Sequence, residues 1–408
     1  MYRNYFRRSD SSEQQIYDQL LRGLEAAVDP SLLENLHKLS FIMFKPDAYL
    51  RGLVPSIMQV LIENHIFPIK WTRMELDSAA IDKLYLFVKP KYLSSWWIME
   101  KSYHAGACVP TIVVGDPQGY ETLSLRIRDL VGPTTPIVGK PEHIRYRFRG
   151  SHRIFNILHG TDDPASAVRE ALVFFGFQEL HHALEVAQTV PRAGEQLCSK
   201  PQEGFSDLLP AGPMETSKNV AQFNLKRELA KDISRETDLL VREFATLVDG
   251  ALLSKEHRRM LEWLEKSGPS LQMMLRDEGK VLEMGFPLRE ESSKLRGIRE
   301  LEQILCYTGV HATTSLFELL DRVVKAFAEP LALVGRFERL KGYYGVLHLL
   351  ADDISLLKAG MRPILEYIGQ SGHRASDLEL LTIEASLSVM ETEFHDYTTD
   401  YTRVILGD

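Results

Sequence analysis

The sequence predicts an α+β domain followed by an all-helical domain. Between residues 39 and 177, short apolar segments typical of strands alternate with amphipathic helical periods. Beyond about residue 218 the strand pattern disappears and helical periods continue. Between the two, four prolines and several small polar residues are typical of a linker. We therefore expect a helical extension at 1–38, an α+β domain at 39–187, a linker at 188–217 and a helical domain at 218–408.

Hydrophobic periodicity predicts the elements of the first two segments. Residues 11–37 carry apolar side chains at helical spacing and end near Asp29 and Pro30, which indicates an amphipathic lead helix. Residues 132–153 lack a period and are rich in glycine, proline and arginine, so a long loop is expected. Strands and helices that alternate along the chain are typical of an α+β domain in which the helices pack against an antiparallel sheet. Strands are expected at 41–44, 67–76, 109–114 and 154–158, and helices at 54–64, 78–88, 120–131 and 164–175.

The second domain is predicted to be a helical bundle, because its apolar residues recur at helical spacing and its glycines and prolines separate the periods. Helices are expected at 220–247, 255–274, 292–307, 315–327, 331–359 and 378–405.

Composition excludes several classes of protein. The chain of 408 residues has a formal net charge of −8 and a pI of about 5.9, which argues against general nucleic-acid binding. Its three cysteines are far apart and form neither a metal motif nor a disulfide framework, which is typical of a reducing compartment. No stretch approaches the ~18 apolar residues of a membrane span. We expect a cytoplasmic protein with no membrane or nucleic-acid partner.

A histidine at the end of a short apolar segment is the first candidate for chemistry. His159 follows residues 154–158, the chain turns at Gly160, and Asp162 or Asp163 is expected to cap the next helix. Such a histidine is fixed and yet reachable, which suits a nucleophile that accepts a group and passes it on. Taken alone, a buried histidine is more often a core residue satisfied by a neighbour.

Two motifs resemble those of the nucleoside diphosphate kinase family. They occur in order and at the right separation for one domain, and the resemblance covers roughly residues 39–177. It implies a ferredoxin-like core with extra helices, and a Mg²⁺-dependent, ping-pong transfer of phosphate from an NTP to an NDP through His159. The motifs are Lys45-Pro46-Asp47 with Arg51-Gly52-Leu53, and Asn156-x-x-His159-Gly160-Thr161-Asp162.

The resemblance also implies a set of phosphate contacts. The chain has no Gly-x-x-x-x-Gly-Lys-Ser/Thr loop, so the cations must come from side chains. Lys45 is implied to contact phosphate, and Arg128 with Thr134 to hold phosphate oxygens. Arg145 is implied to reach the terminal phosphate, where its planar fork suits bidentate contact. Without the resemblance, Lys45 and Arg128 would be interpreted as solvated charges.

The remaining implied site residues surround the histidine. Asn156 is implied to contact the sugar, and Thr161 matches the Ser/Thr beside the nucleophile. Glu170, eleven residues after His159, is implied to accept a hydrogen bond from its ring, which leaves the other ring nitrogen free to attack. The alternative interpretation of Glu170 is an exposed helix residue. No protein ligand for the metal is expected, because the nucleotide phosphates hold Mg²⁺.

The sequence departs from the family pattern where the base should stack. The segment that normally reads Tyr-x-x-x-x-x-x-x-Phe-Phe runs here from Tyr85 to Trp96 and Trp97, with about three extra residues. Trp96 is the candidate platform for the base, because an indole stacks on any base. Phe87 or Tyr92 could take the place of the tyrosine. A tryptophan pair is otherwise more often core or interface.

These observations leave more than one function open. The leading hypothesis is an active kinase of broad base specificity, with NTP and NDP as substrates and a homo-oligomeric assembly. One alternative is a nucleotide-sensing or scaffolding module whose helical domain binds a protein partner. Another is transfer of phosphate from His159 to a protein.

Overall fold

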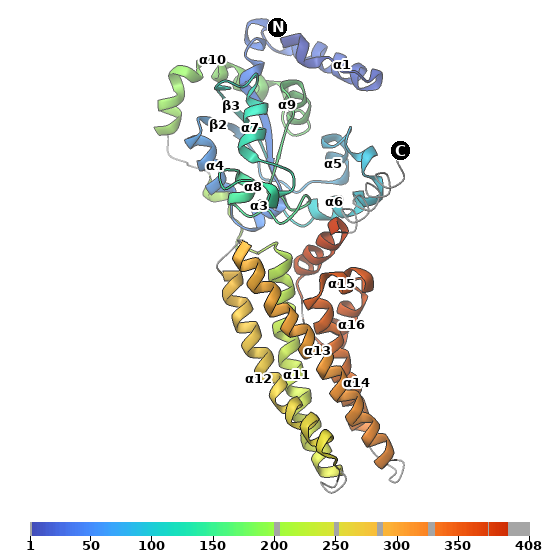
Figure 1. The fold of residues 1–408 in the computed structure, drawn as a ribbon. Coiled ribbons are helices and arrows are strands. Elements are labelled where there is room, and N and C mark those ends of the chain that lie inside the picture. Colours follow the sequence, from blue (N-terminus) through green and yellow to red (C-terminus); the bar gives the residue numbers. More distant parts are fainter. Residues whose placement is uncertain are drawn as a thin grey trace, which may run out of the picture. The chain divides into compact units, whose positions relative to one another are not determined.

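The chain divides into two compact units, residues 1–216 and 217–408. The structure is a computed structural model that describes residues 2–199, 205–248, 253–283, 289–324, 331–373 and 375–390. Figure 1 shows a sheet covered by helices in the first unit and long helices in the second. No helix among the described residues is long and apolar enough to cross a membrane.

A four-stranded sheet lies at the centre of the first unit. Its strands are β1 (Leu39–Phe44), β2 (Ile66–Trp71), β3 (Val109–Gly115) and β4 (Leu158–Gly160), in the order β2-β3-β1-β4. Every neighbouring pair is antiparallel, and β1 lies between β3 and β4. This is the ferredoxin-like arrangement. The predicted fold class, an α+β ferredoxin-like domain followed by an all-helical domain, is confirmed.

Helices cover both faces of this sheet. Because successive side chains of a strand point to opposite faces, the central strands carry apolar side chains on both faces. Phe41 and Met43 point into one core, and Ile42 and Phe44 point into the other. The first core is completed by α1 (Ser11–Ala27), α9 (Pro164–Ala171) and α10 (Phe177–Ser199), and the second by α4 (Val54–Glu63) and α7 (Leu123–Val131).

Shorter helices connect these elements. They are α2 (Pro30–Leu33), α3 (Pro46–Leu50), α5 (Ser78–Leu84), α6 (Trp96–Tyr103) and α8 (Ile144–Arg147). Single 3-10 turns occur at Tyr2–Phe6, Leu36–Lys38, Lys89–Lys91, Leu93–Ser95, Pro136–Val138 and Ser206–Leu208.

The last strand of the sheet lies later in the sequence than the predicted 154–158. The strand β4 begins only at Leu158, because Ile157 has a positive φ of 76° that interrupts extended backbone. The loop predicted at 132–153 contains the one-turn helix α8, and α6 was not predicted.

The predicted linker at 188–217 was wrong in part. Apolar positions on α10, such as Leu184 and Ala187, are buried against the sheet, and the helix continues to Ser199. Farther along, Phe205 and Leu208 are buried in the second core, where the Phe205 ring packs edge-on against Trp71 at 5.2 Å. Two large apolar side chains in a Pro-rich segment therefore belong to the first unit.

Four long helices form the second unit. They are α11 (Lys218–Leu247), α12 (Lys255–Glu283), α13 (Arg289–Val324) and α14 (Leu331–Ala351), and each packs against two of the others (Figure 1). The shorter α15 (Asp353–Ala359), α16 (Arg362–Ser371) and a helix at 377–390 follow. The part of the last predicted helix beyond 390 lies outside the described residues.

Glycine misled the prediction of helix ends in this unit. A break was expected near Gly309, but α13 is continuous there, and a Cβ at Gly309 would lie 2.7 Å from the Tyr344 ring. The helix predicted at 255–274 already included Gly268, and α12 does continue through it, where a Cβ would lie 2.7 Å from the Ser234 hydroxyl. These glycines allow close helix packing and do not end helices. Asp352 instead marks the start of a helix, since its side chain accepts from the Ile354 N–H and caps the N-terminus of α15.

A buried ion cluster joins three of the long helices. The Lys226 ammonium on α11 donates to Glu278 on α12 at 2.5 Å and to Glu302 on α13 at 2.8 Å. All three side chains are fully buried. Burial raises the pKa of Glu302 to about 7. Because these charges meet only when the helices are in register, the cluster favours one alignment of the bundle.

Candidate active site

The end of β1 determines where His159 lies. After Phe44, the Lys45 backbone N–H donates to the Ile157 carbonyl at 2.9 Å, and the Asp47 carboxylate accepts from the Ile157 N–H at 2.8 Å. These two bonds hold Ile157 at its φ of 76°, a conformation that costs a β-branched residue energy. The chain then enters β4 with His159 opposite Met43.

One ring nitrogen of His159 is occupied by a carboxylate. The His159 Nε2 lies 2.6 Å from Glu170 Oε2, and Glu170 is placed by the helix α9. The other carboxylate oxygen accepts from Arg169 at 2.7 Å. A hydrogen bond at Nε2 makes Nδ1 the nitrogen with a free lone pair, which is the requirement for a nucleophile.

A tyrosine that the sequence prediction left unassigned packs against the same ring. Tyr85, at the end of α5, lies edge-on to His159 with ring centroids 5.3 Å apart. Its hydroxyl is 2.5 Å from that of Tyr103, and burial raises the pKa of both phenols. Tyr85 opens the segment that departs from the family spacing, so the extra residues hid it.

A buried lysine and an asparagine lie next to the histidine loop. The Lys45 ammonium donates to Asn156 Oδ1 at 3.1 Å and to the Ile154 carbonyl, and the Asn156 amide donates to the Thr134 carbonyl at 3.1 Å. Burial lowers the pKa of Lys45 to about 8. The structure thus joins Lys45, Asn156 and Thr134 in one network, with the Thr134 side chain exposed.

Two arginines add positive charge. The Arg145 guanidinium donates to the carbonyls of Gly132 at 2.9 Å and Leu158 at 2.7 Å, directly before His159. Burial lowers the pKa of Arg145 to about 10, so it is charged at neutral pH. Arg128 is more than half exposed and pairs with Asp162. Both cations are therefore attached to the loop and strand that carry the histidine.

Two further predicted nucleotide contacts, Thr161 and Trp96, are buried, as Lys45 and Asn156 are. Thr161 is buried and its hydroxyl is bonded to the Phe41 carbonyl at 3.2 Å and to Ser40 at 3.0 Å. Trp96 is only 6% exposed and its ring packs edge-on against Tyr85. The assignment of Trp96 as an open platform for the base is corrected, because the ring is enclosed by the core that also holds Tyr85 and Tyr103. The next residue, Trp97, is 49% exposed.

No cluster of three or more His, Cys, Asp or Glu side chains that could hold a metal occurs in the part of the chain that the structure describes. The site instead gathers cations, Lys45, Arg128 and Arg145, near a histidine with one free nitrogen. This set of cations suits an anionic substrate. It can support attack by an imidazole on a phosphoryl group.

Comparisons with known proteins identify the family to which part of this chain is similar. The family model described as nucleoside diphosphate kinase matches residues 38–180. The nucleoside diphosphate kinase of Ignicoccus hospitalis is 29% identical over 150 residues, which is 37% of this chain and 97% of the relative. That of Desulfitobacterium hafniense is 33% identical over 141 residues, 35% of this chain and 89% of the relative.

A solved structure is also similar to part of this chain. The nucleoside diphosphate kinase of Encephalitozoon cuniculi is 22% identical, covers 36% of this chain and 99% of its own, and has a TM-score of 0.30. The match of the family model ends at residue 180, before the helical unit begins. Through residues 38–180, the chain belongs to the nucleoside diphosphate kinase family.

Proposed function

We propose that this chain transfers the γ-phosphate of an NTP to an NDP by a ping-pong mechanism through phospho-His159. The observation that carries the proposal is the 2.6 Å contact between His159 Nε2 and Glu170, which leaves Nδ1 as the attacking atom. In the first half-reaction the Nδ1 lone pair forms a bond to the γ-phosphorus. The bond from that phosphorus to the bridging oxygen breaks, and the NDP leaves with the electron pair. A terminal phosphate oxygen of a second NDP then forms a bond to that phosphorus, the Nδ1–P bond breaks, and its electron pair returns to Nδ1.

The cations lower the barrier of both half-reactions. Charge develops on the phosphoryl oxygens and on the leaving oxygen, and fixed positive groups at those atoms stabilise it. Arg145 is held by backbone carbonyls on both of its terminal nitrogens, and Lys45 is held by Asn156, so these groups need little reorganisation. Arg128 is exposed and has the freedom to follow the outer phosphates.

Mg²⁺ is proposed to arrive with the nucleotide, held mainly by the nucleotide phosphates, and it would neutralise part of their charge. Base recognition is proposed to come from the exposed apolar side chains beside α6, among them Trp97. Stacking on such side chains distinguishes the bases weakly, so we expect broad specificity. A homo-oligomer is also proposed, by analogy with the family.

A second candidate function is a nucleotide-sensing or scaffolding module. The apolar side chains Leu301, Ile304 and Tyr307, spaced by three on α13 and all more than half exposed, favour it, since they offer a protein partner a contact surface.

One experiment separates these functions. The full chain is incubated with γ-labelled ATP and Mg²⁺, and GDP or candidate proteins are then added. A kinase forms an acid-labile phosphoenzyme that passes its label to GDP, whereas a protein phosphotransferase passes it to protein and a sensor is not labelled. We expect transfer to GDP by the wild type, by the control His104→Gln, whose ring is exposed, and none by His159→Gln. Labelling of His159→Gln at the wild-type rate would show that another residue is the nucleophile.

A further inference from the structure

We infer that Arg169 is a positioning residue for phosphoryl transfer, an inference that rests on the proposed function. The Glu170 carboxylate is bonded on both oxygens, by His159 Nε2 at 2.6 Å and by Arg169 Nη2 at 2.7 Å. The side chains of Arg169 and Glu170 are only 12% and 8% exposed. Ionic hydrogen bonds shielded from water are the short, directional ones, so Arg169 fixes the carboxylate that fixes the histidine.

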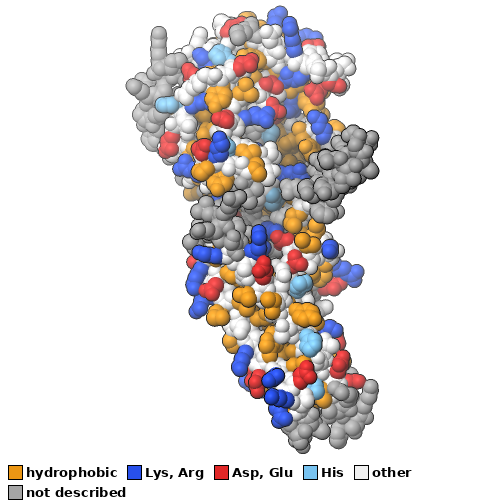
Figure 2. Space-filling view, in the orientation of Figure 1, with side chains coloured by type: hydrophobic (Ala, Val, Ile, Leu, Met, Phe, Trp, Pro, Cys, Tyr) orange, Lys and Arg blue, Asp and Glu red, His pale blue; other side chains and the backbone are white. Residues whose placement is uncertain are grey.

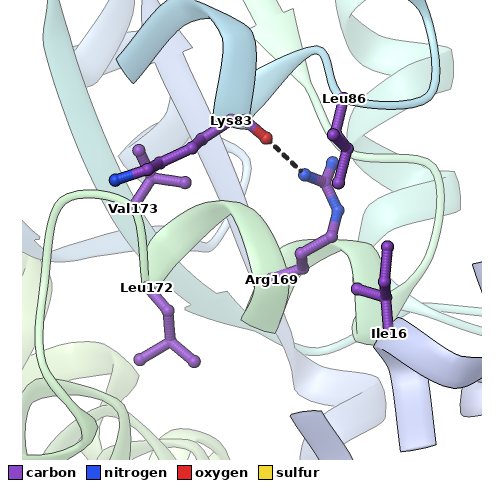
Figure 3. A pocket seen from close by; sticks show the side chains of 6 residues that line it. All are labelled: Ile16, Lys83, Leu86, Arg169, Leu172 and Val173. Atoms are coloured by element: carbon purple, nitrogen blue, oxygen red, sulfur yellow. Dashed lines mark hydrogen bonds between the residues drawn. The ribbon is translucent and has the colours of Figure 1, made fainter. Parts of the chain in front are cut away.

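Arg169 is itself anchored to the end of another helix. Its guanidinium donates to the Lys83 carbonyl at 2.8 Å and to the Leu84 carbonyl at 3.1 Å, as Figure 3 shows for Lys83. These are the last carbonyls of α5, which lack partners within the helix and are favourable sites for a cation. The next residue is Tyr85, whose ring packs against His159. Arg169 therefore links the two groups that contact the histidine ring, the carboxylate and the phenol.

The N-terminal extension supports this link from outside. The Arg169 guanidinium lies 5.3 Å from the centre of the Phe87 ring, which stacks on Tyr17 of α1 at 5.8 Å. The Tyr17 hydroxyl is 3.1 Å from that of Ser166 on α9. Residue 17 precedes the segment that matches the family model, which begins at 38. The extension thus packs on the phenylalanine that covers the arginine and on the helix that presents Glu170.

A small pocket borders the arginine. Its volume is about 240 Å³, and Figure 3 shows Ile16, Leu86 and Leu172 beside Arg169. A shorter side chain at position 169 would open a path for water from this pocket to Glu170. Water would compete with His159 for the carboxylate, and the imidazole would lose its fixed orientation. The loss should affect the chemical step and leave nucleotide binding intact.

The test uses the full chain in a rapid-quench measurement of phosphoenzyme formation from γ-labelled ATP across pH 5.5–9. For Arg169→Gln we expect the maximal rate to fall roughly ten- to a hundred-fold, with an unchanged half-saturating ATP concentration. The acid limb of the pH–rate profile should also move to higher pH, because loss of a nearby cation favours the protonated, inactive imidazole. Arg169→Lys should recover only part of the rate, since a point charge cannot span Glu170 and two carbonyls. Arg22→Gln, a change of the same charge at an exposed position of α1, should behave as wild type.

Two results would overturn the inference. One is a wild-type rate and pH profile in Arg169→Gln. The other is a wild-type rate in Arg169→Lys, and this variant is the test if circular dichroism shows that Arg169→Gln does not fold.

Nuclear magnetic resonance of ¹⁵N-histidine separates this inference from the proposed function, with His159→Gln identifying the signal of His159. If wild type forms no phosphoenzyme, the proposed function fails. The NMR spectrum then still reports whether Arg169 holds His159 in the Nε2–H tautomer, and the same tautomer population in Arg169→Gln would refute the link.

Discussion

Replacing Lys45 by methionine should separate the catalytic value of the buried ammonium from its energetic cost. Burial lowers the pKa of Lys45 from an ordinary 10.5 to about 8. At about 1.4 kcal/mol per unit, this depression means that the charged lysine costs the folded protein about 3 kcal/mol relative to its neutral form. The cost is tolerated where a cation is needed at the phosphates.

The sign of the pH dependence follows from proton linkage. Between pH 8 and 10.5 the unfolded chain keeps the lysine proton that the folded protein has released, so unfolding binds a proton and stability rises with pH. Below pH 8 both states are protonated, and the full penalty is present. Lys45→Met lacks this titration. The difference in unfolding free energy, wild type minus variant, should therefore increase by about 3 kcal/mol from pH 8 to 10.5, whatever constant offset the lost hydrogen bonds to Asn156 and Ile154 add.

The assay is urea unfolding of both proteins at several pH values, followed by tryptophan fluorescence. Three of the four tryptophans, Trp71, Trp96 and Trp97, lie in the first unit. In parallel, the wild-type kcat/KM for ATP should decline above about pH 8, while Lys45→Met should be roughly ten- to a hundred-fold slower and lack that decline. A stability difference that stays constant from pH 8 to 10.5 would refute the reasoning about burial. Wild-type transfer by Lys45→Met would refute the role at the phosphates.

Four further predictions follow, one on Arg145, one on the end of the first unit and two on the ion cluster. Arg145→Ala should slow phosphoryl transfer roughly ten- to a hundred-fold, and Arg145→Lys should recover only part of the rate, because lysine lacks the planar guanidinium that binds phosphate through two nitrogens. Steady-state kinetics check this, and full activity of the lysine variant would contradict it. Phe205→Ala should destabilise the first unit by about 3–5 kcal/mol in urea unfolding, and a loss below about 1 kcal/mol would contradict its burial. Lys226→Met should destabilise the helical unit by about 3–5 kcal/mol by circular dichroism without changing transfer, since two buried carboxylates lose their cation. In the wild type, Glu302 should make the helical unit lose stability as pH rises from about 4.5 to 7, because the folded state holds its proton longer, and a flat profile would contradict this.

The sequence predicted the parts of the fold and site that depend on local pattern. The apolar runs of β1 and β3 are easily recognised because both faces of these strands are buried, and the family resemblance pointed to Glu170, eleven residues after His159. The structure brings those two side chains to 2.6 Å. Helical periods likewise indicated the bundle, since every long helix packs along one face.

Other features depend on contacts that no local pattern contains. The Tyr85 ring packs against His159 only because α5 ends beside β4. The residues around Tyr85 in the sequence did not indicate this contact. Phe205 is buried because a core far away in sequence has room for it, so a fragment ending at 187 would lack a part of that core. Gly309 looked like a helix end because close packing against Tyr344 and a turn both require the same residue type.

The length of the helices has a geometric consequence for the second unit. The helix α13 has 36 residues and, at 1.5 Å per residue, is about 54 Å long. Lys226 lies near the start of α11 and Glu278 near the end of α12, so the ion cluster is at one end of this rod, whereas Phe244, near the end of α11, packs on Phe337 toward the other. A molecule bound at the aromatic end is too distant to touch the ionic end. Any signal between the two ends must travel as a sliding or rotation of whole helices, and the ion cluster resists that movement because it fixes their register.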